Sequence, residues 1–292
     1  MAAIYKQKEK NLCDDTFIKT ILEKLPQIDD KDAWDLLGFV NKNKEVFPFG
    51  NDSKIIGRLF EVIVYPYLQA VAEELDYKLF ESEKQTVYPD FYFLKPNGKR
   101  IALDIKTTYR QFDKKGKVKE FHFTAGSYTS FLRNGTKNID GHYSDYDKHY
   151  ILGFLYSRNN SITIRKVNLE SEDISSLLPA YKDVEYFVQE KYKVAGTAKG
   201  SGNTDNIGTF KSKKIKDFQE GNGPFSILGD DLFHIYWKNF PKYKDSSEVK
   251  ERLFNNLQTF TKWGKETEKL SSEQLTRLEE YLSSGTDEKY SQ

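Results

Sequence analysis

The amino-acid sequence predicts a mixed α/β domain, of the α+β kind, with a helical C-terminal third. Three observations favour this fold class. Residues 51–74 have the apolar spacing of one long helix, residues 90–107 change to the two-residue alternation of a β-hairpin, and residues 230–284 return to helical spacing. The chain has 292 residues and is long enough to bury a full-sized core.

The N-terminal part is predicted to be helical. Residues 14–43 are expected to form two short helices separated by the sequence PQIDDKD, in which Asp30 and Asp32 are candidate helix caps. A longer helix is expected from about residue 51 to residue 74. It should be kinked at Pro66, because proline lacks the amide proton that a helix interior requires.

The remaining elements follow from the same patterns. Further strands are predicted at residues 150–157, 161–169 and 184–192. Helices are predicted at residues 230–240, 247–263 and 271–284. The last helix has a capping box from Ser271 and Gln274, and Gly285 is its expected stop.

Composition restricts the functional classes. The net charge is +1 and aromatic residues make up 15% of the chain, so neither a disordered chain nor a globally basic nucleic-acid binder is indicated. The one cysteine, Cys13, excludes an internal disulfide framework. The sequence contains no apolar run of membrane length and no leader pattern. We therefore expect a soluble cytoplasmic protein with no membrane partner, in which any nucleic-acid surface is local.

The predicted hairpin carries the candidate chemistry. In RIALDIKT, residues 100–107, the odd positions are apolar, whereas Asp104 and Lys106 project from the other face because side chains alternate along a strand. The partner strand begins at YPD. Pro89 ends strand pairing there and leaves the carboxylate of Asp90 at the rim of the sheet.

The register of this hairpin decides which residue lies opposite Asp90. A two-residue turn at 97–98 would place Asp90 opposite Ile105, on the apolar face. A three-residue loop at 97–99 instead matches apolar side chains across the two strands and places Asp90 opposite Lys106. We therefore predict the three-residue loop, which brings two carboxylates and one ammonium together.

A third acid favours a metal site over an ordinary charged surface. Glu61 lies in IIGRLFEVIV, an apolar part of the long helix, and Gly57 one turn earlier leaves open space beneath it. Clustered carboxylates repel one another, and a hard divalent cation such as Mg²⁺ relieves that repulsion. A lysine beside such a cation positions an attacking water and helps to deprotonate it. The alternative is that Asp104 and Lys106 belong to a solvated face, because an Asp-x-Lys pattern is common.

Six segments carry a resemblance to a known family. They are DSKIIGRLFE, YPDF, IALDIKTTY, YTSFLRNGTKNI, VAGTAKGSGNTDNIG and KDFQEGNGPF. Asp90 and Asp104, with 13 residues between them, and Lys106 resemble the PD…(D/E)xK nuclease signature. The six segments, in this order, closely resemble the EcoRV family of type II restriction endonucleases over residues 45–265.

The resemblance implies a fold and an activity. The fold would be a restriction-endonuclease-like core, with a mixed central β-sheet flanked by helices and a small dimerisation subdomain. The protein would be a bacterial, cytoplasmic homodimer that cuts both strands of a short palindromic site in double-stranded DNA, with a cognate DNA methyltransferase in the same system. Hydrolysis would require Mg²⁺, for which Mn²⁺ would substitute, and would leave blunt ends with 5′-phosphates. The implied target is GATATC or a close variant.

The resemblance also implies site residues. The catalytic set comprises Asp90, Asp104, Lys106 and Glu61. The metal site comprises Asp90, Asp104, Glu61 and Ile105. DNA contacts outside the recognition loop are expected from Lys54, Gln85, Thr107, Thr108 and Lys137. In the recognition loop they are expected from Gly200, Ser201, Gly202, Asn203, Thr204 and Asn206.

The recognition loop contains the stretch SGNTDNIG, residues 201–208, which composition alone would make a flexible linker. A loop that enters the major groove needs glycine for close backbone approach, and amide, hydroxyl and methyl groups for base edges. This stretch supplies all of them, with Asn206 expected to fix the shape of the loop and Ile207 to anchor it. We therefore predict a shaped loop that selects the DNA sequence.

Several features depart from the family pattern. The loop SEKQTVYPD is one residue shorter and less polar than the family's minor-groove loop. Lys199 and Asp205 stand where the family has uncharged residues, and an acid near DNA phosphates is unfavourable unless it is turned away. The helix at 271–284 has no counterpart in the family and is expected to enlarge the dimer interface or to brace the fold.

The resemblance divides the chain into three predicted regions. An N-terminal helical extension with part of the dimerisation region is followed by the catalytic and DNA-binding domain and by a C-terminal helical extension. Their bounds are residues 1–44, 45–265 and 266–292.

Two other functions would use parts of the same site. A sequence-specific DNA-binding protein would keep the fold without cutting, although the complete acid–acid–lysine set argues against this function. A DNA-processing nuclease without sequence choice would share the metal site, and its cleavage pattern would distinguish it.

Overall fold

The structure is a computed structural model, in which the described residues are 15–84, 86–161, 165–171, 173–200, 205–242 and 253–285. The chain divides into two compact units, which are described separately. Unit 1 comprises Met1–Leu75, Thr107–Lys119 and Gly153–Tyr186. Unit 2 comprises Asp76–Lys106, Glu120–Leu152 and Phe187–Gln292. The fold class is mixed α+β, as the sequence predicted.

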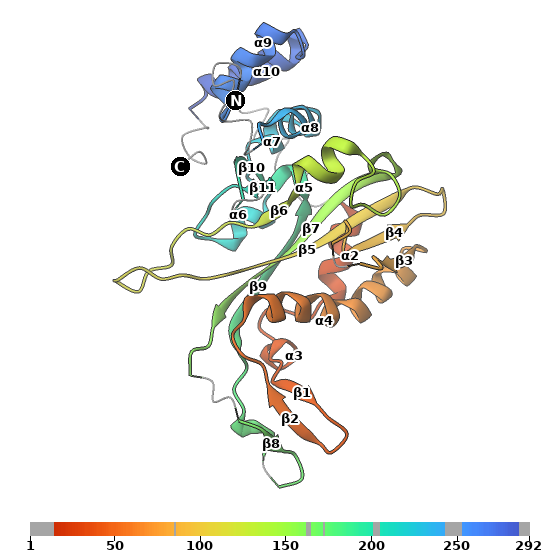
Figure 1. Ribbon diagram of the computed structural model, residues 1–292, viewed down its shortest axis with the longest axis vertical. Coiled ribbons are helices and arrows are strands. Elements are labelled where there is room, and N and C mark those ends of the chain that lie inside the picture. Colours follow the sequence, from red (N-terminus) through yellow and green to blue (C-terminus); the bar gives the residue numbers. More distant parts are fainter. Residues whose placement is uncertain are drawn as a thin grey trace. The chain divides into compact units, whose positions relative to one another are not determined.

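The described residues of unit 1 form three helices and a small antiparallel sheet. The helices are α2 (Thr16–Lys24), α3 (Lys31–Trp34) and α4 (Ser53–Glu74). The sheet consists of β1 (Gly38–Val40), β2 (Glu45–Pro48) and β8 (Val167–Asn168), which lie side by side in the order β1-β2-β8 (Figure 1). A 3₁₀ turn, η3, spans Ile174–Ser176.

Helix α4 is the long helix that the sequence predicted. The side chain of Asp52 caps it by accepting hydrogen bonds from the main-chain N–H groups of Lys54 and Ile55, and Pro66 lies inside it. Its buried ring, Phe60, stacks on Phe154 with ring centroids 4.3 Å apart. By length and composition α4 could cross a membrane, but a buried apolar face of this kind is also typical of a core helix.

Two sequence expectations in unit 1 require correction. Residues 14–43 were expected to form two short helices. The second helix, α3, has only four residues, and residues 38–40 form a strand instead. Phe39 pairs with Phe47, because aromatic and β-branched residues favour an extended strand that has a partner. The strand expected at 161–169 is present in the described residues only as Val167–Asn168.

The central sheet has five strands in the order β3-β4-β5-β7-β9. Strands β3 (Lys78–Glu81) and β4 (Phe91–Leu94) belong to unit 2. Strands β5 (Arg100–Tyr109), β7 (Tyr146–Arg158) and β9 (Tyr181–Glu190) contribute residues to both units. The predicted strands at 150–157 and 184–192 therefore correspond to β7 and β9.

The β4–β5 hairpin is confirmed, but its predicted register is wrong by two residues. Phe91 pairs with Leu103 rather than with Ile105. The loop is closed by the hydrogen bond from the Lys95 N–H to the Lys99 carbonyl, with Gly98 at a φ of 81°. A shift of two residues keeps every side chain on its face, so apolar matching cannot distinguish the two registers. The observed loop, residues 96–98, is as long as the one predicted at 97–99, and Gly98 in the left-handed region distinguishes the observed register.

Unit 2 also contains a second sheet, which the sequence patterns did not predict. It consists of β6 (Thr124–Ser127), β10 (Ala195–Lys199) and β11 (Asn206–Thr209) in the order β10-β11-β6. Strands β10 and β11 are antiparallel and form a hairpin around residues 200–205. Ile207 is fully buried in this sheet and anchors the hairpin to the unit, as expected.

Short helical segments complete the first part of unit 2. A π-helical turn, η1, spans Tyr128–Leu132, and a 3₁₀ turn, η2, spans Tyr143–Asp145. Three further segments are α5 (Lys191–Val194), α6 (Ile215–Gln219) and α7 (Phe225–Leu228). The longer helices are α8 (Asp230–Asn239), α9 (Leu257–Thr267) and α10 (Ser272–Ser283), and α9 and α10 lie side by side (Figure 1).

The C-terminal helices match the sequence prediction with one correction. The capping box of Ser271 and Gln274 is present, and Gly285 follows α10 at a φ of 68°. Of the helix expected at 247–263, the described residues from 253 onward are helical only from Leu257, where Asn256 caps α9 by accepting the N–H of Thr259. Residues 243–252 lie outside the described residues.

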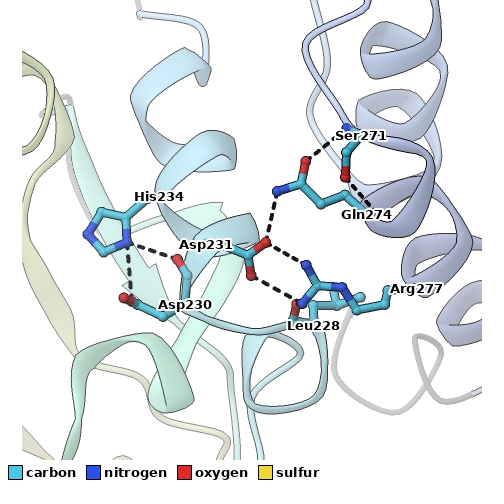
Figure 2. Close-up of polar contacts among 7 residues, drawn as sticks. All are labelled: Leu228, Asp230, Asp231, His234, Ser271, Gln274 and Arg277. Atoms are coloured by element: carbon cyan, nitrogen blue, oxygen red, sulfur yellow. Dashed lines mark hydrogen bonds and ion pairs between the residues drawn. The ribbon is translucent and has the colours of Figure 1, made fainter.

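Helix α10 contacts the start of α8 through hydrogen bonds and an ion pair. Arg277 pairs with Asp231 at 2.5 Å and donates to the Leu228 carbonyl at 2.8 Å (Figure 2). Gln274 also donates to Asp231, at 2.8 Å. The structure therefore supports the bracing role expected for this helix within the chain.

Candidate active site

The carboxylates of Asp90 and Asp104 lie together at the start of β4, where the pairing between β4 and β5 ends. Asp90 directly precedes β4, and the pairing of Phe91 with Leu103 places it beside Asp104 rather than opposite Lys106. The main-chain N–H of Ile105 donates to Asp90 Oδ2 at 2.7 Å, which fixes that carboxylate against β5. The predicted pairing partner was wrong, but the predicted convergence of the three side chains is present.

Lys106 lies between the two carboxylates. Its Nζ is 3.0 Å from Asp104 Oδ2 and 3.6 Å from Asp90 Oδ2. The Lys106 side chain is 24% exposed, whereas the Asp104 side chain is only 4% exposed. The lysine can therefore reach solvent or a bound molecule, but the carboxylate of Asp104 faces the protein interior.

The electrostatics of Asp104 follow from these neighbours. Burial by itself raises the pKa of a carboxyl group, because the charged form loses its hydration. The ammonium groups of Lys106 and Lys191 outweigh this effect, so the pKa of Asp104 lies below its ordinary value. Asp104 Oδ2 is buried and accepts no hydrogen bond of good geometry within the described part of the chain, although it has both ion pairs.

Lys191 is a site residue that sequence reasoning missed. It begins α5 directly after β9, it is 2% exposed, and its Nζ lies 3.9 Å from Asp104 Oδ2. Burial lowers the pKa of Lys191 to about 8, against the attraction of Asp104. A single lysine near the end of the strand predicted at 184–192 gives no signal in the sequence, because lysine is almost always exposed.

Buried rings lie behind the carboxylates. Tyr88 stacks on Phe131 with ring centroids 4.0 Å apart, and its hydroxyl forms a hydrogen bond of 2.8 Å with His149 Nδ1. Burial lowers the pKa of His149 well below its ordinary value, so the imidazole is neutral at neutral pH. The ring of Tyr143 stacks on that of His149, with ring centroids 4.2 Å apart. This layer of packed rings restricts the backbone next to Asp90.

Glu61 lies on α4 in unit 1 and pairs with Arg58, with Glu61 Oε2 and Arg58 Nη1 2.5 Å apart. The predicted open space beside Gly57 is not empty. A Cβ atom at Gly57 would lie 3.4 Å from Oγ1 of Thr107, which is an ordinary van der Waals contact within unit 1. The role of Glu61 in metal binding stays a prediction.

The residues expected to contact the DNA backbone lie on several elements. Lys54 is exposed in the first turn of α4, and Thr107 and Thr108 are half-buried on β5. Lys137 is exposed, and its carbonyl accepts a hydrogen bond of 2.8 Å from the Ser130 hydroxyl. Gln85 lies outside the described residues.

The described part of the recognition loop is its base. The main-chain N–H of Gly200 donates to the Asn206 carbonyl at 2.9 Å, which closes the hairpin. A Cβ atom at Gly200 would lie 3.0 Å from Thr124 Oγ1, a tight contact that the glycine avoids. Ser201, Gly202, Asn203 and Thr204 lie outside the described residues, so the shape of the loop itself stays a prediction.

Asp205, which the family pattern left without a role, is turned toward the protein. Its Oδ1 accepts a hydrogen bond of 3.0 Å from the Tyr128 hydroxyl and lies 3.5 Å from Lys199 Nζ. The two residues that depart from the family pattern therefore neutralise each other at the base of the loop.

The mixed sheet and the acid–acid–lysine set on two adjacent strands define the class of PD…(D/E)xK nucleases. A family model described as restriction endonuclease EcoRV matches residues 30–265. The chain is 38% identical over 240 residues to the type II restriction enzyme EcoRV of Escherichia coli, a match that covers 80% of this chain and 93% of that protein. The chain therefore belongs to the EcoRV family of restriction endonucleases and is an enzyme of this type.

Proposed function

We propose that this restriction endonuclease cuts both strands of GATATC, or of a close variant, at the centre of the site. The products would be blunt ends with 5′-phosphates. The observation that carries the proposal is the convergence of Asp90, Asp104 and Lys106 at one end of the β4–β5 hairpin. These three residues would form the catalytic set, with Glu61 in a supporting role.

The donor set fits a hard divalent cation, Mg²⁺ or Mn²⁺. Asp104 Oδ2 is a buried oxygen that accepts no hydrogen bond of good geometry from a described residue, and Asp90 lies beside it. Among the described residues, no three His, Cys, Asp or Glu side chains form a ready-made site. Mg²⁺ commonly binds through one or two carboxylates and takes its other ligands from water and phosphate. Asp90, Asp104 and the carbonyl oxygen of Ile105 would hold it, with Glu61 as a further ligand.

The cation would stabilise the charge that develops on the phosphate during hydrolysis. The chain's own contribution is the placement of Lys106. Its partly exposed ammonium can turn from the carboxylates toward a bound phosphodiester. After it has lost a proton to solvent, the neutral amine would orient the attacking water and take up a proton from it. The water would attack phosphorus in line with the 3′-oxygen, which leaves and retains the bonding electrons.

Sequence choice is assigned to the loop between β10 and β11. The glycines at 200 and 202 would let the backbone approach the major groove, and Asn203, Thr204 and Asn206 would offer groups for base edges. Ser201 completes this set. Lys54, Gln85, Thr107, Thr108 and Lys137 would contact the DNA backbone. The central TA step of the site bends easily, so it can be selected through deformation without direct contact.

The target symmetry determines the partners. A palindromic site presents the same half to each of two identical subunits, so the active form would be a homodimer. The host DNA would need protection from this activity, which a cognate DNA methyltransferase would provide in the bacterial cytoplasm.

The proposal is tested by incubating the protein and Mg²⁺ with a plasmid that contains one GATATC site. A single linear product is expected from the wild-type protein and none from Lys106→Ala. A smear would favour a nuclease without sequence choice. Binding without any cut would favour a DNA-binding protein, and either result would contradict the proposal.

A further inference from the structure

The active site contains a second lysine that differs from Lys106 in its surroundings. Lys191 is 2% exposed, and its Nζ lies 3.9 Å from the ring centroid of Tyr88 and 5.1 Å from that of Phe131. Within the part of the chain that the structure describes, its Nζ has no hydrogen-bond partner. Its nearest carboxylate oxygen is Asp104 Oδ2, at 3.9 Å.

A buried ammonium loses its hydration, so something must offset that loss. Two aromatic faces and one buried carboxylate provide the compensation here. Asp104 already has an ammonium closer to it, that of Lys106 at 3.0 Å. A second cation is therefore more than the neutralisation of Asp104 alone requires.

The second lysine balances the charge of the carboxylate pair. Asp90 and Asp104 carry two negative charges, and Lys106 and Lys191 carry two positive ones. The cluster is therefore balanced before any metal ion binds. A divalent cation entering the carboxylate pair would meet two positive charges and would have to displace or outweigh them.

The two lysines can respond differently to that event. Lys106 contacts both carboxylates and its side chain is 24% exposed, so its ammonium can turn outward. Lys191 is enclosed by Tyr88 and Phe131 and has no such path. After Lys106 has turned to the substrate, Lys191 would remain beside Asp104.

We propose that Lys191 is a positioning residue of the metal centre. Its buried ammonium holds the Asp104 carboxylate in place while Lys106 turns to the substrate, and its charge lowers the affinity of the carboxylate pair for a divalent cation when no DNA is bound. This inference rests on the metal-dependent cleavage proposed above. It assigns control of the metal affinity of the DNA-free protein to one residue.

The test is a calorimetric titration of the full-length, DNA-free protein with Ca²⁺ at neutral pH. Lys191→Met keeps the length of the side chain and removes the charge. It should bind Ca²⁺ about fivefold or more tightly than wild type, as expected when one nearby unit charge is removed. Lys193→Met is the matched control, because Lys193 lies on the same turn but pairs with Glu190 at 2.6 Å. It should leave the affinity unchanged, and Asp104→Asn should abolish binding.

The same variants separate positioning from general stabilisation. At saturating Mg²⁺, Lys191→Met should cleave about tenfold or more slowly in a single turnover, with DNA affinity nearly unchanged. A merely structural residue would instead weaken Ca²⁺ binding or leave it unaltered. Lys191→Arg, which keeps the charge, should retain near wild-type Ca²⁺ affinity.

Each outcome decides one question. A folded Lys191→Met with wild-type or weaker Ca²⁺ affinity overturns the role of Lys191. If Lys191→Met is unfolded without metal but folds on adding Ca²⁺, the role is supported, and if it is unfolded under both conditions, the role is overturned. If the wild-type protein shows no Ca²⁺ binding that depends on Asp104, the metal-dependent function itself fails, and the inference fails with it.

Discussion

The main-chain N–H of Ile105 donates a hydrogen bond of 2.7 Å to Asp90 Oδ2. One carboxylate of the active site is thus held by the strand that carries the other, Asp104. The geometry of the pair therefore depends on the register of the hairpin.

This bond separates the structural role of Asp90 from its catalytic role. Asp90→Ala leaves the Ile105 N–H without that acceptor and should lower the free energy of unfolding by about 1–3 kcal/mol. Asp90→Asn retains an acceptor and should cost less. Both variants lose the charge and should cleave about 100-fold or more slowly. Urea unfolding and single-turnover cleavage measure the two effects, and normal cleavage by Asp90→Asn would refute the assigned role.

His149 predicts a loss of stability in mild acid. Burial holds its pKa well below the ordinary value of 6.5, so on acidification the unfolded chain takes up a proton before the folded protein does. The stabilisation is complete above about pH 6.5 and is lost as the pH falls below it, by up to about 1.4 kcal/mol per pH unit. His149→Asn keeps an acceptor for Tyr88 and should remove this slope between about pH 6.5 and pH 5. His142→Asn, at an exposed histidine, is the control, and equal slopes in both variants would contradict the prediction.

The base of the recognition loop should be sensitive to one hydroxyl group. Tyr128 is fully buried, and its hydroxyl lies 3.0 Å from Asp205 Oδ1 and 2.8 Å from the Pro241 carbonyl. Tyr128→Phe should lower the free energy of unfolding by about 1–2 kcal/mol. It should also reduce the ratio of cleavage rates at GATATC and at single-substitution sites, because the loop ends are held less firmly. Cleavage of matched oligonucleotides measures this ratio, and an unchanged ratio would remove Tyr128 from sequence selection.

The C-terminal helix should contribute to stability without contributing to chemistry. Arg277→Ala removes the pair with Asp231 and the bond to the Leu228 carbonyl (Figure 2), and it should cost about 1–2 kcal/mol of unfolding free energy. Lys265 pairs with Glu279 on a more exposed surface, so Lys265→Ala should cost less than about 0.5 kcal/mol. The cleavage rate at saturating DNA should be unchanged in both variants. A slower reaction without loss of stability would indicate a role at the active site instead.

The sequence predicted that the three side chains of the site lie together, but it did not predict which residues pair across the β4–β5 hairpin. The alternation in RIALDIKT determines that Asp104 and Lys106 share a face, and any register shifted by two residues preserves this. Only the turn, with Gly98 at positive φ, selects the pairing that brings Asp90 beside Asp104. The correct cluster was therefore obtained from an incorrect register.

Other parts of the site had no local signal. Lys191, directly after β9, is buried because its side chain lies against the rings of Tyr88 and Phe131. Those two rings come from segments that are distant in the sequence. Strands β6, β10 and β11 are short and rich in small side chains, so their intrinsic strand propensity is weak. Tertiary pairing, rather than local preference, makes them strands.

Sequencing of the DNA ends that the protein produces is the most direct test of the proposed activity. Genomic DNA lacking protective methylation would be digested with the wild-type protein and Mg²⁺, and both ends of every fragment would be determined. Blunt ends with 5′-phosphates are expected, each ending in GAT on one side of the cut and beginning with ATC on the other. Ends without a shared sequence, or a shared site that lacks the outer GAT and ATC halves, would contradict the proposed function.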